Sequence, residues 1–220
     1  MSPEGAVRAW QHDNFELIET FRWEPPELFV RLGLQMSRLQ ASAAELGFPF
    51  DLARARENLN EVERESVPLR IKMTLCQTGE IGVTAQRFTA NPPNVCWRLR
   101  IAKTRLRSDN RLLRHKTSQR DIYNRARSEY SVGYADEVLL LNELGELSEG
   151  TITNAFVRFS DGKMPTPALQ CGLLRGVLRE ELLARGEAIE ARITVSDLSR
   201  AKQVYVGNSL RGLMDATLEI

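Results

Sequence analysis

The stretch DEVLLLNELGELSEGTITNAFV, residues 136–157, decides how the second half of the chain folds. Its first part, Glu137–Asn142, is a short apolar run that predicts a buried strand. The polar residues Glu143–Glu146 end that run with a turn, and Thr153–Arg158 predicts a second strand. The stretch therefore predicts a strand, a turn and a further strand.

The segments on either side add helices to these strands. Before the stretch, Lys116–Ser131 predicts a helix, and after it Asp161-Gly162 predicts a tight hairpin turn. Apolar spacing over Leu174–Gly186 then predicts a second helix. A short apolar strand, Gln203–Gly207, leads into the polar pair Asn208-Ser209.

The first half predicts a helix pair and an antiparallel sheet. In chain order we expect a strand at Phe15–Trp23, helices at Glu27–Leu46 and Asp51–Glu65, and strands at Leu69–Cys76, Ile81–Phe88 and Val95–Ala102. Residues 103–114 are polar and aperiodic, which suits a connection between domains. We therefore predict an α+β protein with domains at 1–105 and 115–220 and an interdomain connection at 106–114.

Composition places the chain among globular proteins. Of its 220 residues, 42% are hydrophobic and 27% are charged, which allows a substantial core. No apolar run is long enough to span a membrane and the N-terminus lacks the apolar core of a signal peptide, so we expect a cytoplasmic protein. Three widely spaced cysteines and two histidines favour neither a disulfide framework nor a zinc site, so we expect no metal.

Basic residues are concentrated between Arg98 and Arg127, where only Asp109 and Asp121 are acidic. They are Arg98, Arg100, Lys103, Arg105, Arg107, Arg111, Arg114, Lys116, Arg120, Arg125 and Arg127. Such a stretch favours an anionic ligand, whether nucleic acid, a phosphate-bearing cofactor or an acidic substrate. Nucleic acid is disfavoured because Trp97 and Tyr123 lie at the two ends of the stretch with no aromatic residue between them.

Several segments together resemble the class IV aminotransferases, and among these most closely the aminodeoxychorismate lyases. They are FELIETFRW (15–23), MSRLQASAAELGF (36–48), RHKTSQRDIY (114–123), DEVLLLNELGELSEGTITNAFV (136–157), CGLLRGVLRE (171–180) and VYVGNSLRGL (204–213). The resemblance covers nearly the whole chain, although residues 50–100 match only in pattern. It implies the two-domain, D-amino-acid aminotransferase-like fold of type IV pyridoxal-phosphate enzymes, with pyridoxal 5'-phosphate as cofactor.

The resemblance also implies which residues bind that cofactor. Lys116, the HKT lysine, matches the residue that forms the Schiff base, and Glu149 matches the carboxylate that faces the pyridine nitrogen. Leu174 matches the aliphatic side chain that packs on the cofactor ring. The phosphate contacts match the backbone N–H groups of Val177 and Leu178, the Ser209 side chain and Arg38. At Leu178 the family usually has a threonine.

The lyase reading implies elimination of pyruvate from 4-amino-4-deoxychorismate to give 4-aminobenzoate, a step of folate biosynthesis. Arg211 and Arg22 are then candidates for binding the two substrate carboxylates, and Asn208 is a further substrate-binding candidate. Thr20 is a catalytic candidate that positions a water or a proton. The alternative is a transaminase of the same fold acting on branched-chain or D-amino acids, which needs the same cofactor residues. The sequences HKT, EGTITN and GNSLRGL favour the lyase.

Two expectations about partners follow from the resemblance. Family enzymes are commonly homodimers, so we expect a homodimer that acts on a small dicarboxylate and binds neither nucleic acid nor membranes. Fourteen residues precede Phe15, where standalone enzymes carry a further strand and hairpin. This start resembles lyase domains fused behind aminodeoxychorismate synthase, which makes such a synthase an expected partner.

Overall fold

The computed structural model describes residues 14–26, 28–63, 65–92, 94–131 and 133–219. The chain forms two compact units. The first unit ends at Thr89 and also contains Lys116–Gln119, whereas the second contains Ala90–His115 and the chain from Arg120 onward. Residues 1–13 of the expected N-terminal domain lie outside the described residues.

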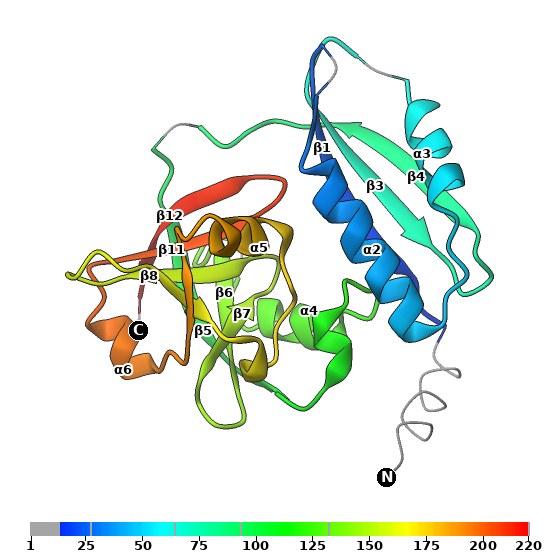
Figure 1. The fold of residues 1–220 in the computed structure, drawn as a ribbon. Coiled ribbons are helices and arrows are strands. Elements are labelled where there is room, and N and C mark those ends of the chain that lie inside the picture. The colour runs from blue at the N-terminus through cyan, green and yellow to red at the C-terminus, as the bar shows by residue number, and fades with distance from the viewer. Residues whose placement is uncertain (1–13, 27, 64, 93, 132, 220) are drawn as a thin grey trace. The chain divides into compact units, whose positions relative to one another are not determined.

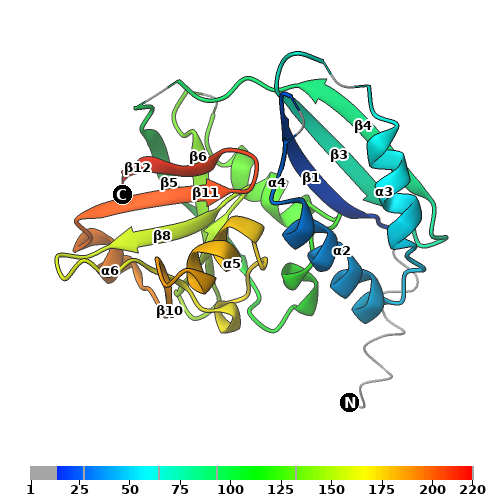
Figure 2. The ribbon, with the colours of Figure 1, turned by 45° about the horizontal axis from the view of Figure 1, so that its top comes forward.

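The first unit is a four-stranded antiparallel sheet covered on one face by two helices (Figures 1 and 2). Its elements are β1 (Leu17–Glu24), β2 (Leu28–Val30), α2 (Leu32–Leu46), α3 (Leu52–Asn60), β3 (Leu69–Leu75) and β4 (Ile81–Arg87), and the strand order is β2-β1-β3-β4. Along β1, buried and half-buried residues alternate, as expected for a strand with one face on the core. The carboxylate of Asp51 caps α3 by accepting hydrogen bonds from Ala53 N and Arg54 N at 2.9 and 3.2 Å.

The second unit is built on a six-stranded mixed sheet in the order β7-β6-β5-β12-β11-β8. Its elements are β5 (Trp97–Leu106), a 3₁₀ turn (Arg111–Arg114), α4 (Asp121–Ser128), β6 (Glu137–Asn142), β7 (Leu147–Gly150), β8 (Asn154–Arg158), β9 (Pro165–Pro167), a 3₁₀ turn (Leu169–Cys171), α5 (Val177–Ala184), β10 (Ile189–Ala191), α6 (Val195–Ser199), β11 (Gln203–Asn208) and β12 (Gly212–Leu218). β7 and β8 stand at opposite ends of this order, yet three residues join them. The sheet is therefore curled, so that its two edges meet.

Alternation along the strands divides the core of the second unit. Leu139 and Leu141 of β6 point into a cluster on the inner face of the curled sheet, which α6 closes through Leu198. Val138 and Leu140 point the opposite way, toward Ala126 of α4. On β8 and β11 the outer face packs against α5 through a separate cluster of Phe156, Met164, Leu178, Leu182 and Ala188. Both α4 and α5 therefore lie on the outer face of the sheet.

The structure confirms the α+β class but places several expected elements differently. The expected strand Val95–Ala102 is β5, and it belongs to the second unit, where it pairs in parallel with β6 and β12. The division between the units accordingly falls at Thr89 and not at residue 105. β2 occupies part of the expected helix Glu27–Leu46, because Phe29 and Val30 pair with β1 before α2 begins; Glu27 itself lies outside the described residues.

Candidate active site

Lys116 lies on an extended segment and not on the expected helix. The Lys116 carbonyl accepts a hydrogen bond from Ile18 N at 2.8 Å, and Ser118 N donates to the Glu16 carbonyl at 2.9 Å. These bonds hold the segment against β1 as a short extra strand, so α4 begins only at Asp121. Thr117 pairs with Leu17, and both of these side chains are buried. By alternation, the half-buried Lys116 faces the side of the sheet opposite α2.

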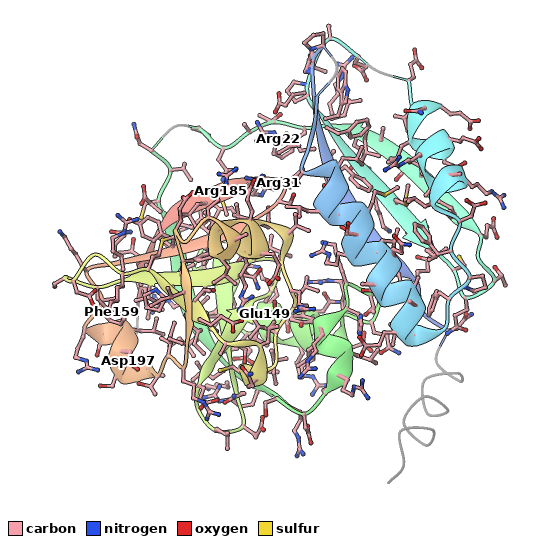
Figure 3. All side chains as sticks on the ribbon, in the orientation of Figure 1. Arg22, Arg31, Glu149, Phe159, Arg185 and Asp197 are labelled. Carbon is pink, nitrogen blue, oxygen red and sulfur yellow. The ribbon has the colours of Figure 1, made fainter. Side chains whose placement is uncertain are left out.

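Thr20 and Arg22 lie on this same open face of the first unit, since they alternate with the buried residues of β1. Thr20 pairs with Lys72 of β3, and Arg22 pairs with Arg70. Side chains directly opposite each other share a face, so the face that carries Lys116 is also rich in positive charge. Figure 3 labels Arg22, which forms an ion pair with Glu24 and stacks 5.4 Å from the centre of the Phe88 ring.

Arg38 has a buried partner within the first unit. Its Nε and Nη2 atoms donate to the two carboxylate oxygens of Glu19 at 2.7 and 2.6 Å. Glu19 is only 1% exposed, and the two-point contact with Arg38 satisfies both of its buried oxygens. The expected contact of Arg38 with a phosphate stays a prediction, and the structure gives this arginine a stabilising role of its own.

Glu149, labelled in Figure 3, is a buried acid of the second unit. It belongs to β7, where it pairs with Leu140 and so faces the side of the sheet that α4 covers. Its Oε1 atom accepts a hydrogen bond from the Tyr123 hydroxyl at 2.6 Å, and its Oε2 atom accepts from Leu174 N at 3.2 Å. Burial raises the pKa of the Glu149 carboxyl to about 7, and a cation placed against this carboxyl would favour its charged form.

A second buried carboxylate, Glu137, holds the turn that follows Glu149. Glu137 is fully buried, and its two oxygens accept hydrogen bonds from the backbone and hydroxyl of Thr151, from Ile152 N and from the Thr153 hydroxyl, at 2.5–3.0 Å. These bonds fix the path of the chain from β7 to β8. Gly150 has room only for a hydrogen atom, because a Cβ there would sit 2.9 Å from the Glu137 carboxylate.

The start of α5 lies directly against this turn. Asn154 of β8 donates to the Leu174 carbonyl at 3.1 Å, while its Oδ1 atom touches Gly176, the N-cap of α5. Because the cap residue is a glycine, it supplies no side-chain acceptor to the N–H groups of the first helical turn. These N–H groups, with the positive end of the helix dipole, form a suitable binding site for an anion.

The expected residues Leu174, Val177 and Leu178 therefore lie together beside Glu149. Leu174 is half-buried, and its backbone is fixed by hydrogen bonds to both Glu149 and Asn154. Leu178 packs into the apolar cluster between α5 and the sheet, which explains a leucine where the family usually has a threonine. Its side chain thus serves the core, and only its backbone N–H can serve the site.

The end of β11 completes this group. Gly207 lies so close to α5 that a Cβ on it would meet Leu178 Cδ2 at 2.7 Å. Asn208 donates to the Ile152 carbonyl at 3.1 Å, and its Oδ1 atom accepts from Leu210 N and Arg211 N at 3.1 and 2.9 Å. This side chain therefore shapes the turn that carries Ser209.

Arg211 leaves that turn toward a different group of residues. Its Nη1 atom donates to the Asn91 side chain at 3.4 Å, and its guanidinium lies 5.9 Å from the centre of the Trp97 ring. The alternative partner weighed from sequence, Asp215, is exposed on β12, where it pairs with Tyr205. The expected contact of Arg211 with a substrate carboxylate stays a prediction.

Sequence reasoning missed three residues that shape the site: Tyr123, Glu137 and Asn154. Each one contacts Glu149 or the turn that follows it. The signal for Asn154 was an amide at the start of an apolar strand, where a buried polar group needs a partner. The signal for Glu137 was an acid at the first position of a strand whose other side chains are nearly all apolar. Among the described residues, no helix is long and apolar enough to span a membrane, and no group of three or more acidic, histidine or cysteine side chains could hold a metal ion.

The two-unit fold, with a glycine-capped helix beside a buried glutamate, is that of a fold type IV pyridoxal-phosphate enzyme. The family described as amino-transferase class IV matches residues 16–218, and the chain belongs to this family. Its members are pyridoxal-phosphate-dependent enzymes, so the chain is an enzyme of this class. The fold and family expected from sequence are thereby confirmed.

Three proteins that are similar to this chain carry names of two kinds, lyase and aminotransferase. A Schizosaccharomyces pombe protein named "Putative aminodeoxychorismate lyase" is 31% identical over 94% of this chain and 91% of its own length. A solved Mesorhizobium loti structure, named "Putative amino-acid aminotransferase", is 51% identical with a TM-score of 0.91, covering 93% of this chain and all of that one. The 4-amino-4-deoxychorismate lyase of Pseudomonas aeruginosa shares the fold at 23% identity and a TM-score of 0.77, covering 92% of this chain and 82% of that one.

The residues of the second unit fit the cofactor that the family uses. A pyridine nitrogen that carries a proton needs a buried carboxylate, and Glu149 provides one. A phosphate needs converging backbone N–H groups, which the first turn of α5 provides beside the turn that carries Ser209. The first unit supplies an extended lysine, Lys116, on its open face.

Proposed function

We propose that the protein is a 4-amino-4-deoxychorismate lyase, which eliminates pyruvate from its substrate and leaves 4-aminobenzoate. The observation that carries this proposal is the 31% identity, over nearly the full length of both chains, to the S. pombe protein whose name states this activity. Arg211, which follows the polar residues Asn208 and Ser209, supports it, because a guanidinium can bind a carboxylate of a substrate that carries two.

Bound pyridoxal phosphate supplies an electron sink for the electron pair that is released when the substrate loses a proton. In the proposed enzyme, the amine of Lys116 attaches the cofactor and then moves the proton at the amine-bearing carbon of the substrate. Glu149 keeps the proton on the ring nitrogen. The first turn of α5, Ser209 and Arg38 bind the phosphate, and Leu174 packs against the ring.

The remaining residues orient the substrate. Arg22 and Arg211 bind carboxylates, Asn208 orients the turn between them and the phosphate, and Thr20 positions a water or a proton. Arg70 and Lys72, opposite Arg22 and Thr20 on the open face of the first unit, add positive charge that favours a dianionic substrate. The ring loses the proton at its amine-bearing carbon, and the bond between the neighbouring ring carbon and the enolpyruvyl oxygen breaks, which makes the ring aromatic. The released enolpyruvate takes up a proton and becomes pyruvate.

A transaminase is the second candidate, and one specific observation favours it. The Mesorhizobium loti protein, 51% identical to this chain, is named as an amino-acid aminotransferase. Lys116, Glu149 and the phosphate site would serve either reaction, so these residues do not separate the two candidates.

One experiment separates them. The purified protein loaded with pyridoxal phosphate is incubated with 4-amino-4-deoxychorismate, and 4-aminobenzoate and pyruvate are measured. Parallel reactions contain branched-chain or D-amino acids with 2-oxoglutarate, and glutamate is measured. We expect equal amounts of 4-aminobenzoate and pyruvate and no comparable transfer of amino groups. Fast glutamate formation without 4-aminobenzoate would make the protein a transaminase.

A further inference from the structure

The carboxylate of Glu149 is oriented by three donors from three different segments. Tyr123 of α4 donates to Oε1 at 2.6 Å, Leu174 N donates to Oε2 at 3.2 Å, and the Asn154 side chain approaches Oε2 at 3.5 Å. The tyrosine bond is the shortest of the three, and it is made to Oε1, whereas the other two donors are at Oε2. Of the three, the Tyr123 hydroxyl is the one that a single conservative substitution removes without changing the backbone.

Glu149 titrates near neutrality, so its surroundings decide whether it is charged in the resting enzyme. Burial raises the pKa of its carboxyl to about 7, and the nearby charge of Glu137 raises it further by a small amount. The hydrogen bond from Tyr123 is the largest influence that lowers this pKa, followed by the Leu174 N–H and the charge of Arg120. The tyrosine therefore acts against burial at a carboxylate that must be an anion to accept a cationic partner.

Tyr123 is itself constrained to remain a donor. Burial and the negative charge of Glu149 raise the pKa of its hydroxyl well above the ordinary value, so it keeps its proton. Its ring packs beside the cluster of Ala102, Leu106 and Leu140. The guanidinium of Arg120 lies 4.9 Å from the ring centre and donates a hydrogen bond to the Thr151 carbonyl, which links the ring to the turn after Glu149.

We propose that Tyr123 is a positioning residue that fixes the Glu149 carboxylate and favours its charged form, ready to face a protonated ring nitrogen. The part that concerns the cofactor rests on the proposed function, whereas the effect on Glu149 does not. A tyrosine that only fills space between α4 and the sheet would leave the titration of Glu149 unchanged when its hydroxyl is removed.

The chain offers a matched pair of variants for the test. Tyr123→Phe removes the hydroxyl at Glu149. Tyr130→Phe removes another partly buried tyrosine hydroxyl from the same cluster, one that donates to the Ile101 carbonyl at 2.8 Å. The two variants therefore lose the same atom and a comparable hydrogen bond, but only the first loses it from a carboxylate.

The first measurement uses the protein without cofactor. The carboxyl C=O band that Glu149→Gln abolishes is followed by infrared spectroscopy as a function of pH. We expect Tyr123→Phe to raise the midpoint, the pH at which this band falls to half of its intensity, by about one unit or more. The reason is that the variant loses a hydrogen bond that stabilises the charged carboxylate, and such a bond corresponds to roughly one pKa unit or more. Tyr130→Phe should keep the wild-type midpoint. An unchanged midpoint in Tyr123→Phe would overturn the proposal.

The second measurement is the dissociation constant of pyridoxal phosphate, determined by absorbance between pH 6 and pH 9. We expect Tyr123→Phe to bind about tenfold more weakly than wild type near pH 7 and to recover as the pH passes its higher midpoint. A loss of the same size at every pH would show a packing effect and would contradict the proposal. If the wild-type protein binds no pyridoxal phosphate, the proposed function fails, but the infrared titration still decides the role of Tyr123.

Discussion

Gly176 lies so close to Asn154 that a Cβ on the glycine would sit 1.7 Å from the Asn154 Oδ1 atom. Gly176→Ala should therefore displace either Asn154 or the first turn of α5. We expect a loss of about 1–3 kcal/mol in the free energy of unfolding and weaker binding of pyridoxal phosphate. Thermal unfolding and an absorbance titration measure the two effects. The control is Gly33→Ala in α2, where a Cβ meets no atom within 4 Å and stability should change by less than about 1 kcal/mol.

Lys116 should be the attachment point of the cofactor. After addition of pyridoxal phosphate and reduction with borohydride, mass spectrometry of peptides should find the added pyridoxyl mass on Lys116. Lys116→Ala should lose that label and at least about 100-fold in turnover, the usual contribution of a proton-transferring group. Lys163→Ala is the control, because Lys163 is an exposed lysine paired with Asp161 in the hairpin before β9. Label on another lysine would contradict the assignment.

Glu149→Gln should bind the cofactor but lose most of its turnover, because an amide cannot keep the proton on the ring nitrogen. We expect a fall of about 100-fold or more in kcat, measured at saturating substrate. Glu143→Gln provides the comparison, since Glu143 lies in the turn between β6 and β7 and accepts hydrogen bonds from Ser108. Near-normal turnover in Glu149→Gln would mean that another group faces the nitrogen.

The same substitution predicts a pH-dependent change in stability without cofactor. The folded protein binds the Glu149 proton more tightly than the unfolded chain, because the pKa of the carboxyl rises from 4.5 to about 7 on folding. The stabilising effect of the protonated carboxyl is complete below pH 4.5 and is lost as the pH rises to 7. The stability of Glu149→Gln relative to wild type should therefore increase by about 3 kcal/mol across this window. Urea unfolding at pH 4.5 and pH 8 measures it, and a constant difference would contradict the prediction.

Arg211 tests the substrate pocket apart from the chemistry. If it binds a substrate carboxylate, Arg211→Ala should lower kcat/KM by roughly 2–4 kcal/mol while cofactor binding is unchanged. Arg211→Lys should recover only part of the loss, because an ammonium cannot make a planar two-point contact. The structure also places Arg211 on Asn91 and Trp97. An alanine variant that melts earlier but keeps its kcat/KM would assign the arginine to that packing alone.

The sequence predicted the strands whose pattern is local. β6 was expected at Glu137–Asn142 and is found there, because a short apolar run bounded by polar residues is typical of a buried strand. β7 and β12 were missed: Leu147–Gly150 lies between the predicted turn Glu143–Glu146 and the predicted strand from Thr153, and Gly212–Leu218 is stabilised by pairing with β11 and β5. Non-local pairing of this kind leaves little trace in the residues themselves.

In the site, too, local motifs were predictable and contacts between distant segments were not. Glu149 was identified by its place in a family motif, but its three donors come from segments between 5 and 26 residues away. The helix expected from Lys116 onward was wrong at its start, because hydrogen bonds to Glu16 and Ile18 hold Lys116–Ser118 in an extended conformation. Periodicity alone cannot reveal a competing partner a hundred residues earlier in the chain.

The short strand that carries Lys116 limits how chimeras can be built from two proteins of this fold. The first unit is discontinuous, since its last piece, Lys116–Gln119, returns to β1 after 26 residues that belong to the second unit. A chimera with one junction at Thr89 would pair β1 of one parent with the lysine segment of the other. Recombination between relatives therefore needs two junctions to preserve this pairing, and any exchange of the first unit as a whole carries the lysine with it.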